Sequence, residues 1–245
     1  MATNFETGHA KNVANFETLI ACCRGFKEKY NPSNEELILD TLSIFYIDTK
    51  ENVRRVKEAK ARFDEIEGLR MTAFKPYKSL ATKIIGALSV SGASSTVISD
   101  AETINRRMQG RRAPGGKTSL GENNKPADKI SVSQQSYDLK IDHFEKLIEL
   151  LSREPKYIPN EAPLKIASLK AYRAELQDLN TSVKNAYIPY SNAINVRNRD
   201  LYASEVGLVA KAQAIKKYVK SVYGAKAPEY KSVTKITFRR LVKIQ

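Results

Sequence analysis

The amino-acid sequence predicts an all-α fold made of two tandem similar helical units, whose long, coiled-coil-like antiparallel helices pack as a pseudo-symmetric bundle. Three observations support this prediction. Apolar residues recur at helical spacing over most of the 245-residue chain. One stretch keeps an apolar step of seven residues, and several motifs occur twice. Glycine and proline lie mostly between the periodic stretches, as expected for turns.

Two motifs occur once in each half of the chain. Residues 15–20 read Asn-Phe-Glu-Thr-Leu-Ile, and residues 143–148 read His-Phe-Glu-Lys-Leu-Ile. Residues 30–37 begin Tyr-Asn-Pro, and residues 157–164 begin Tyr-Ile-Pro. We interpret features that occur in both copies as structural, whereas a feature of one copy alone is a better candidate for function.

The first unit follows a polar segment at residues 1–10 that predicts a flexible arm. Apolar residues at helical spacing predict a helix over residues 11–29. Pro32 ends this helix because the residue before a proline disfavours helical geometry. Ser33 or Asn34 then caps the next helix, since their side chains accept hydrogen bonds from the first free backbone amides.

The longest periodic stretch lies in the middle of the first unit. One of its two seams steps by seven residues through Val56, Phe63, Arg70, Tyr77 and Ile84. This spacing is typical of a coiled coil. Pro76 predicts a kink or a break inside it. The stretch ends at residues 91–95, and a short basic helix is predicted over residues 97–108.

A second unit repeats this plan. Its first helix is predicted over residues 136–152 and its turn at residues 157–160. A long periodic stretch follows over residues 176–222, with Pro189 as a candidate kink and Gly224 as its end. Residues 228–245 predict either an extended segment or a final helix.

The predicted organisation therefore has four parts. They are a flexible arm at 1–10, a helical repeat unit at 11–109, a basic linker rich in glycine and proline at 110–130, and a second helical repeat unit at 131–245 that carries a basic C-terminal tail.

The excess positive charge is confined to the end of each unit. Residues 1–103 and residues 131–206 each contain equal numbers of basic and acidic side chains. Residues 104–130 carry a net charge of +5 and residues 207–245 a net charge of +9, which together account for the formal +14 of the chain. Each unit is thus a neutral body with a basic end.

These basic ends predict a non-enzymatic protein that binds DNA, RNA or another polyanion. Arginine forks bind phosphates, and neighbouring glycines let the backbone follow an irregular polyanion. Contacts to phosphates carry little sequence information. The candidate nucleic-acid-binding residues are Arg106, Arg107, Arg111, Arg112, Lys117, Lys216, Lys217, Lys220, Lys235, Arg239 and Arg240.

Other interpretations of the same features stay open. The basic surface also suits solubility or a protein contact. The first alternative function is a structural or scaffolding helical protein that self-associates as a homo-oligomer or binds a protein partner. The second is a membrane-active helical protein, although the apolar stretch at residues 84–98 has no Trp or Phe to anchor it at an interface.

The sequence favours no catalytic, metal or cofactor chemistry. His9 and His143 are the only histidines, and Asn15 stands at the place in the first copy that His143 occupies in the second. A capping or surface role is therefore expected for His143. Cys22 and Cys23 are adjacent and are interpreted as reduced thiols. No spacing of titratable groups fits a reaction, so we expect no enzyme activity, no cofactor and no small-molecule substrate.

The distribution of apolar residues and the composition of the N-terminus predict a cytoplasmic protein without a membrane span. No apolar run reaches the length that crosses a bilayer. The N-terminal residues are polar and acidic and do not resemble a secretion signal.

Five runs resemble those of an uncharacterised protein family of Bacteroidota. They are Thr-Gly-His-Ala-Lys-Asn-Val-Ala-Asn-Phe-Glu at 7–17, Tyr-Asn-Pro-Ser at 30–33, Thr-Ile-Asn-Arg-Arg at 103–107, Ile-Ser-Val-Ser-Gln at 130–134 and Tyr-Val-Lys-Ser-Val-Tyr-Gly at 218–224. The resemblance spans nearly the whole chain. The resemblance implies that the two-unit organisation and the Asn-Arg-Arg segment are regular features of that family. It implies no activity.

Overall fold

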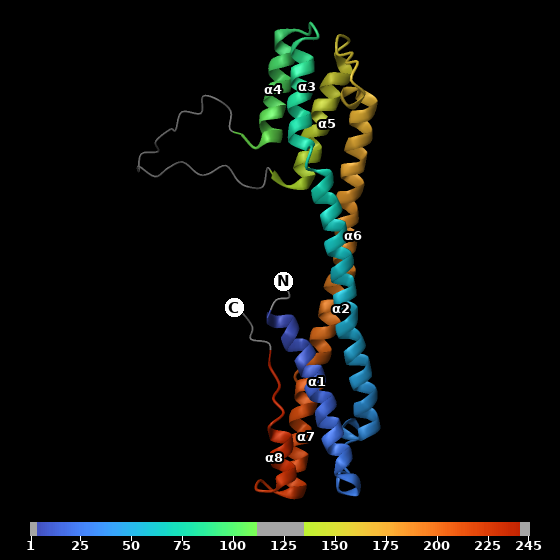
Figure 1. Ribbon diagram of the computed structural model, residues 1–245, viewed down its shortest axis with the longest axis vertical. Helices are drawn as coiled ribbons and strands as arrows, with labels where there is room; N and C mark the ends of the chain where they lie inside the picture. The colour runs from blue at the N-terminus through green and yellow to red at the C-terminus, as the bar shows by residue number, and fades with distance from the viewer. Residues whose placement is uncertain (1–3, 112–134, 241–245) are drawn as a thin grey trace, which may run out of the picture. The chain divides into compact units, whose positions relative to one another are not determined.

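A computed structural model describes residues 4–111 and 135–240 of the chain. Every regular element in this part is a helix, so the predicted all-α class is confirmed (Figure 1). The chain forms two compact units. Unit 1 comprises residues 1–63 and 186–245, and unit 2 comprises residues 64–185. Each unit is described by itself below.

Unit 1 is built from helices at both ends of the sequence. They are α1 (Asn4–Gly25), the first part of α2 (Leu39–Ala73), the last part of α6 (Ile166–Tyr202), α7 (Leu208–Tyr223) and α8 (Pro228–Thr234). Helix α7 packs against both α1 and α8, and Figure 1 shows these three helices together.

The core of unit 1 lies where α1 meets α7. Phe16 and Leu19 of α1 and Ile215 and Val219 of α7 are fully buried in one cluster. Their spacing of three or four residues places them on one face of each helix. Burying each such side chain contributes about 1.5–3 kcal/mol, so this shared face is a main source of the stability of unit 1.

Unit 2 contains the end of α2, then α3 (Tyr77–Ser89), α4 (Ser95–Gln109), α5 (Tyr137–Arg153) and the start of α6. Helix α4 packs against both α3 and α5. The fully buried side chains of its core come from α3, α4, α5 and α6 and include Ile84, Leu88, Met108, Leu147, Leu169 and Leu176.

Short 3₁₀ helices complete the turn that precedes each long helix. They are η1 (Lys27–Lys29) and η2 (Glu35–Leu37) before α2, and η4 (Ala162–Leu164) before α6. The Asn34 side chain accepts a hydrogen bond from the Glu36 amide at 3.0 Å, as expected for a capping residue. The predicted cap is therefore found at the start of η2, and α2 itself begins later.

The compact units do not follow the boundaries of the sequence repeats at 11–109 and 131–245. Unit 1 takes α1 and the start of α2 from the first repeat, and the end of α6, α7 and α8 from the second. Unit 2 takes the complementary parts. The physical reason is that α2 and α6 are continuous helices, each of which contributes side chains to two separate cores.

Helices α2 and α6 contact each other in antiparallel order within each unit. In unit 1 the Asn52 amide donates to the Asp200 carboxylate at 2.7 Å. In unit 2 the Arg70 guanidinium donates to the Asn180 side chain at 3.1 Å, and the Tyr172 hydroxyl donates to the Ala73 carbonyl at 2.7 Å. The contact partner moves backward along α6 as α2 advances, as the predicted antiparallel arrangement requires.

The N-terminal arm differs from its prediction. Helix α1 begins at Asn4 and therefore includes most of the predicted arm at residues 1–10. Gly8 and His9 are buried, and His9 Nδ1 lies 2.6 Å from the Tyr202 hydroxyl oxygen. This tertiary contact orders a segment whose polar composition predicts flexibility.

The two long periodic stretches are each divided into two helices. Around Pro76 the chain breaks, with α2 ending at Ala73 and α3 beginning at Tyr77. Pro189 lies inside α6 and does not end it. The break between α6 and α7 falls instead before Gly207, where a Cβ atom would lie 2.6 Å from the Ala203 amide nitrogen.

Candidate polyanion-binding site

Helix α7 and the segment after it bring six of the predicted basic residues into unit 1. The Lys216 ammonium donates a hydrogen bond to the Ile236 carbonyl and lies 5.4 Å from the centre of the Phe238 ring. The Lys220 ammonium lies 5.9 Å from the centre of the Tyr230 ring. Lys216 of α7 therefore lies beside Ile236 and Phe238, and Lys220 lies beside Tyr230 of α8.

Residues 235–240 are held in place by amide side chains of α1. The Asn12 side chain pairs with the backbone of Arg239 in both directions: its oxygen accepts from the amide at 2.9 Å and its nitrogen donates to the carbonyl at 2.8 Å. The Asn15 side chain donates to the Thr237 carbonyl at 2.6 Å. Two asparagines one helical turn apart thus bind this non-helical backbone as a neighbouring strand would.

The basic side chains in this region are mostly exposed and lack carboxylate partners. Within the described residues none of the following forms an ion pair: Lys217, Lys220, Lys235, Arg239 and Arg240. Glu229 is the only acidic residue between positions 207 and 245. Lys216 is half-buried, and this burial lowers the pKa of its ammonium group from the ordinary value.

Some basic residues elsewhere in the described chain form ion pairs. Arg54 pairs with Glu51 at 2.7 Å on the surface of α2. Lys211 is the one lysine of α7 that is buried, and its ammonium lies 2.6 Å from the Glu36 carboxylate. We call the region defined by Lys216, Lys217, Lys220, Lys235, Arg239 and Arg240 the basic face of unit 1.

Three predicted arginines lie in unit 2, at the C-terminal end of α4. Arg106 is half-buried and donates to the Thr103 hydroxyl at 2.5 Å, whereas Arg107 and Arg111 are exposed. These three arginines lie within six residues of one another, at and just beyond the last turn of α4. Arg112 and Lys117 lie outside the described residues, as does almost all of the predicted linker at 110–130.

The end of α4 has a defined backbone geometry. Gly110 caps the helix with a φ of 74°, in the left-handed region that favours glycine. A Cβ atom at this position would also lie 2.9 Å from the Gln135 side chain. The Gln135 amide donates to the Arg107 carbonyl at 3.3 Å, which fixes the start of the second half of the described chain against α4.

Sequence reasoning did not assign a role to Asn12 and Asn15. Both lie in the distinctive run at 7–17, and Asn12 is fully buried although it is polar. The available signal for such a role was that the polar Asn12 lies on the apolar side of the helix predicted over residues 11–29. Its partner is more than 200 residues away, so the local pattern could not identify what it binds.

The structure places the two cysteine thiols and the side chains of the types that bind metals. Cys22 and Cys23 are free thiols, as predicted. Burial, with a contribution from Cys22, raises the pKa of the Cys23 thiol to about 12, so this sulfur stays protonated near neutral pH. Among the described residues no group of three His, Cys, Asp or Glu side chains is placed to hold a metal ion.

His143 differs from its prediction as a capping or surface residue. Its side chain is buried on the inner face of α5, with 7% of its surface exposed. The neighbouring Ile141 and Phe144 enter the same core, so the helix turns this polar position inward.

The chain matches no known protein in the comparisons, and the described helices include no candidate membrane span. Protein-family models, curated protein sequences and solved structures contain no match to the chain. Within residues 4–111 and 135–240, no helix combines the length and the apolar character that crossing a bilayer requires.

Proposed function

We propose that the protein binds a polyanion, DNA or RNA in the first instance, through the basic face of unit 1. The observation that carries the proposal is a set of mostly exposed lysines and arginines that have no carboxylate partners in the described chain. Two of them, Lys216 and Lys220, lie beside aromatic rings. Phosphate oxygens satisfy such unpaired cations, and aromatic faces offer stacking platforms for unpaired bases. Phosphate contacts dominate this interaction, so we expect low sequence specificity.

The way residues 235–240 are held supports this proposal. A flexible basic tail pays an entropic cost when it binds, because its backbone and side chains become ordered. The hydrogen bonds of Asn12 and Asn15 fix the backbone near Arg239 in advance. The arginine side chains of this segment therefore project from an ordered support.

The test is the salt dependence of binding to a 20-base-pair DNA duplex and to a 20-nucleotide RNA. A variant with Lys217, Lys220, Lys235 and Arg240 changed to Gln removes four charges from the basic face. Each lost phosphate contact reduces the slope of log K against log salt by about 0.9 on duplex DNA, so we expect a change of about 3 to 4. Six contacts predict a fall in affinity of about a thousandfold between 50 and 200 mM salt.

A matched control separates the basic face from net charge. Lys57, Lys75, Lys165 and Lys170 are exposed lysines outside the basic face, and changing all four to Gln alters the net charge by the same amount. This control keeps the salt slope if the proposal is right. A flat salt response of the wild-type protein, or equal weakening in both variants, contradicts it.

A third variant tests the contribution of unit 2. Changing Arg106, Arg107 and Arg111 to Gln removes the basic end of α4 without touching the basic face. A loss of slope comparable to that of the first variant assigns both regions to one bound polyanion. An unchanged slope restricts the binding site to unit 1.

A second candidate function is assembly with another protein or with a second copy of this chain. Ile44 and Ile47 are 63% and 61% exposed and lie three residues apart, on one face of α2. Ile47 borders a groove of about 480 Å³ that also includes Val13 and Tyr46. Light scattering of the wild type and of an Ile44→Glu, Ile47→Glu variant tests this candidate. A monomeric mass for both at high concentration removes self-association.

A further inference from the structure

The turn that precedes each long helix holds a buried tyrosine in the same way in both units. In unit 1 the Tyr30 hydroxyl donates to the Leu37 carbonyl at 2.9 Å. In unit 2 the Tyr157 hydroxyl donates to the Leu164 carbonyl at 3.0 Å. The two turns can therefore be compared position by position, whatever the arrangement of the rest of each unit.

In unit 1 a second aromatic ring covers this turn. Tyr218 of α7 packs edge-on against Tyr30, with ring centres 5.3 Å apart and an angle of 87° between the planes. Its hydroxyl accepts a hydrogen bond from the Asn31 amide at 3.0 Å. Pro32, the next residue of the turn, is buried. The space between α7 and the turn is thus filled by a ring of the chain itself.

In unit 2 the helix that faces the turn is α3, and it has no such ring. The buried residues of α3 are Tyr77, Ala81, Ile84 and Leu88, and those of α7 with the same spacing are Leu208, Ala212, Ile215 and Val219. This register places Ala87 where α7 has Tyr218, and Gly86 where α7 has Lys217.

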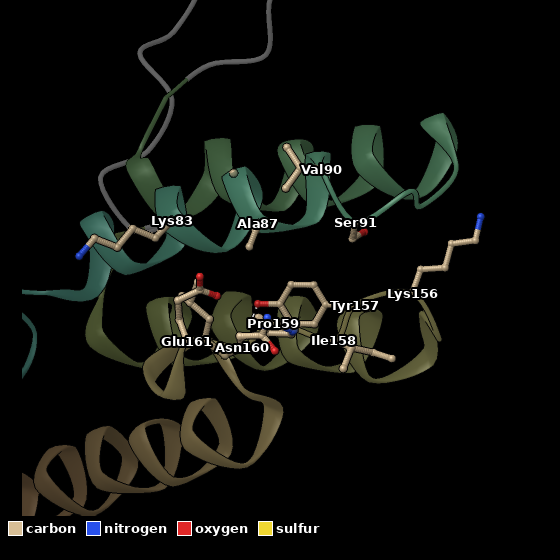
Figure 2. A pocket seen from close by; sticks show the side chains of 12 residues that line it. Lys83, Ala87, Val90, Ser91, Lys156, Tyr157, Ile158, Pro159, Asn160 and Glu161 are labelled. Atoms are coloured by element: carbon tan, nitrogen blue, oxygen red, sulfur yellow. Dashed lines mark hydrogen bonds between the residues drawn. The ribbon is translucent and has the colours of Figure 1, made fainter.

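A pocket of about 650 Å³ occupies the resulting space. Figure 2 shows Ala87 of α3 facing Tyr157 and Pro159 of the turn. The volume falls in the range of sites that take a small ligand or a large side chain. Without a hydroxyl opposite it, the Ile158 amide donates to the Lys156 carbonyl at 3.1 Å.

We propose that this pocket binds an aromatic side chain presented by a partner polypeptide, in the place that Tyr218 fills in unit 1. Two observations favour a polypeptide over a free aromatic molecule. Val90 and Ile158 border the pocket and are 85% and 79% exposed, and a passing chain covers both whereas a single ring does not. An aromatic side chain is also the kind of anchor that fills a pocket at a protein interface.

The charges around the pocket define the flanking residues of the partner. Lys83 and Lys156 line it together with a single carboxylate, Glu161. The side chains of both lysines extend away from the turn in Figure 2. Acidic residues next to the aromatic side chain complement this excess of positive charge. The ligand is therefore an acidic segment with a central tyrosine or phenylalanine.

The first experiment compares three probes by NMR titration of the full-length protein. They are the blocked peptides Asp-Tyr-Glu and Asp-Ala-Glu and the isolated ring compound p-cresol. We expect Asp-Tyr-Glu to shift the amide signals of Val90, Ser91 and Ile158 and to bind about tenfold more tightly than either of the others. Equal binding of the alanine peptide contradicts the ring pocket, and equal binding of p-cresol contradicts the polypeptide partner.

Two variants locate the binding. Ala87→Tyr supplies the missing ring from the chain itself and abolishes the response to Asp-Tyr-Glu, whereas Ala87→Ser leaves the space open and preserves it.

Tyr218→Ala opens the corresponding space in unit 1, where we expect p-cresol to raise the lowered unfolding temperature. If p-cresol rescues Tyr218→Ala but Asp-Tyr-Glu leaves the wild type unchanged, the proposal is overturned. The result does not depend on polyanion binding, since the pocket lies in unit 2 and every probe lacks phosphate.

Discussion

His143 is a single residue whose protonation opposes folding. Its ring nitrogens have no hydrogen-bond partner among the described residues, and the nearest carboxylate oxygen, that of Asp142, lies 3.7 Å from Nδ1. Burial lowers the pKa of this imidazole below its ordinary value of 6.5. The Asp142 charge partly offsets this effect, while Lys146 and Arg107 reinforce it.

The stability of the protein should therefore fall as the pH falls through about 6.5. The unfolded chain binds a proton at His143 first, so the stability linked to this residue is fully present above the unfolded pKa and is lost below it. The loss reaches at most about 1.4 kcal/mol per pH unit. Urea unfolding at pH 7.5 and pH 5.0 measures it, and His143→Phe should show a smaller loss than the wild type. Equal losses in both proteins contradict this role.

Arg70 is a second residue with a specific environment, because its guanidinium group contacts both an aromatic ring and a side-chain amide. Its guanidinium carbon lies 3.9 Å from the centre of the Tyr137 ring, and one of its nitrogens donates to Asn180. Asn180 in turn donates to Asp138 at 2.8 Å. The planar group stacks on the ring and reaches the amide at the same time, which an ammonium group does not do.

Replacing Arg70 by Lys should therefore destabilise unit 2 by about 1–2 kcal/mol, although the charge is kept. Chemical denaturation followed by circular dichroism measures the change. Arg62 lies on the exposed side of α2, so Arg62→Lys is the matched control and should leave the free energy of unfolding within about 0.5 kcal/mol. A stable Arg70→Lys protein would mean that charge alone is needed.

At the scale of elements, α1 acts as a support for the end of the described chain. The backbone around Arg239 forms no helix and depends on Asn12 and Asn15 for its hydrogen bonds. A net contribution of about 1 kcal/mol for each bond is enough to keep this short segment ordered. The same contacts place Arg239 and Arg240 on the basic face.

The variant Asn12→Ala should release this segment without unfolding α1. We expect hydrogen exchange of the Arg239 amide to accelerate by about tenfold or more, because its acceptor is removed. The exchange of the α7 core should change little. Asn192→Ala, at an exposed position of α6, serves as the control. Unchanged exchange at Arg239 would show that Asn12 does not hold it.

The elements themselves were largely predictable where their signals are local. Ser136 accepts from the Leu139 amide and begins α5, and Gly224 ends α7, both as the sequence indicates. The start of α1 was not predictable, because the buried His9 contacts a tyrosine nearly 200 residues away. The sequence also assigned Lys216 and Lys220 of α7 to a basic end. It could not predict their contacts with Ile236 and Tyr230, because these depend on how the segment after α7 folds back onto that helix.

At the scale of the whole molecule, each compact unit combines helices from both sequence repeats. The core of unit 1 needs Phe16 from the first repeat and Ile215 from the second, and that of unit 2 needs Ile84 and Leu147. The repeat pattern predicts similar helices but not which of them share a core. That choice depends on contacts between distant segments, which no local pattern records.

Fragments of the chain distinguish shared cores from independent tandem units. Residues 1–111 and 135–245 each contain only part of either core. Neither fragment alone should therefore give a cooperative thermal transition, and mixing them should restore one. Residues 64–185 contain the complete buried cluster of unit 2. This fragment should fold alone, because none of its buried side chains loses a partner from that cluster. Cooperative unfolding of both half-chain fragments in isolation would instead establish each sequence repeat as a folding unit.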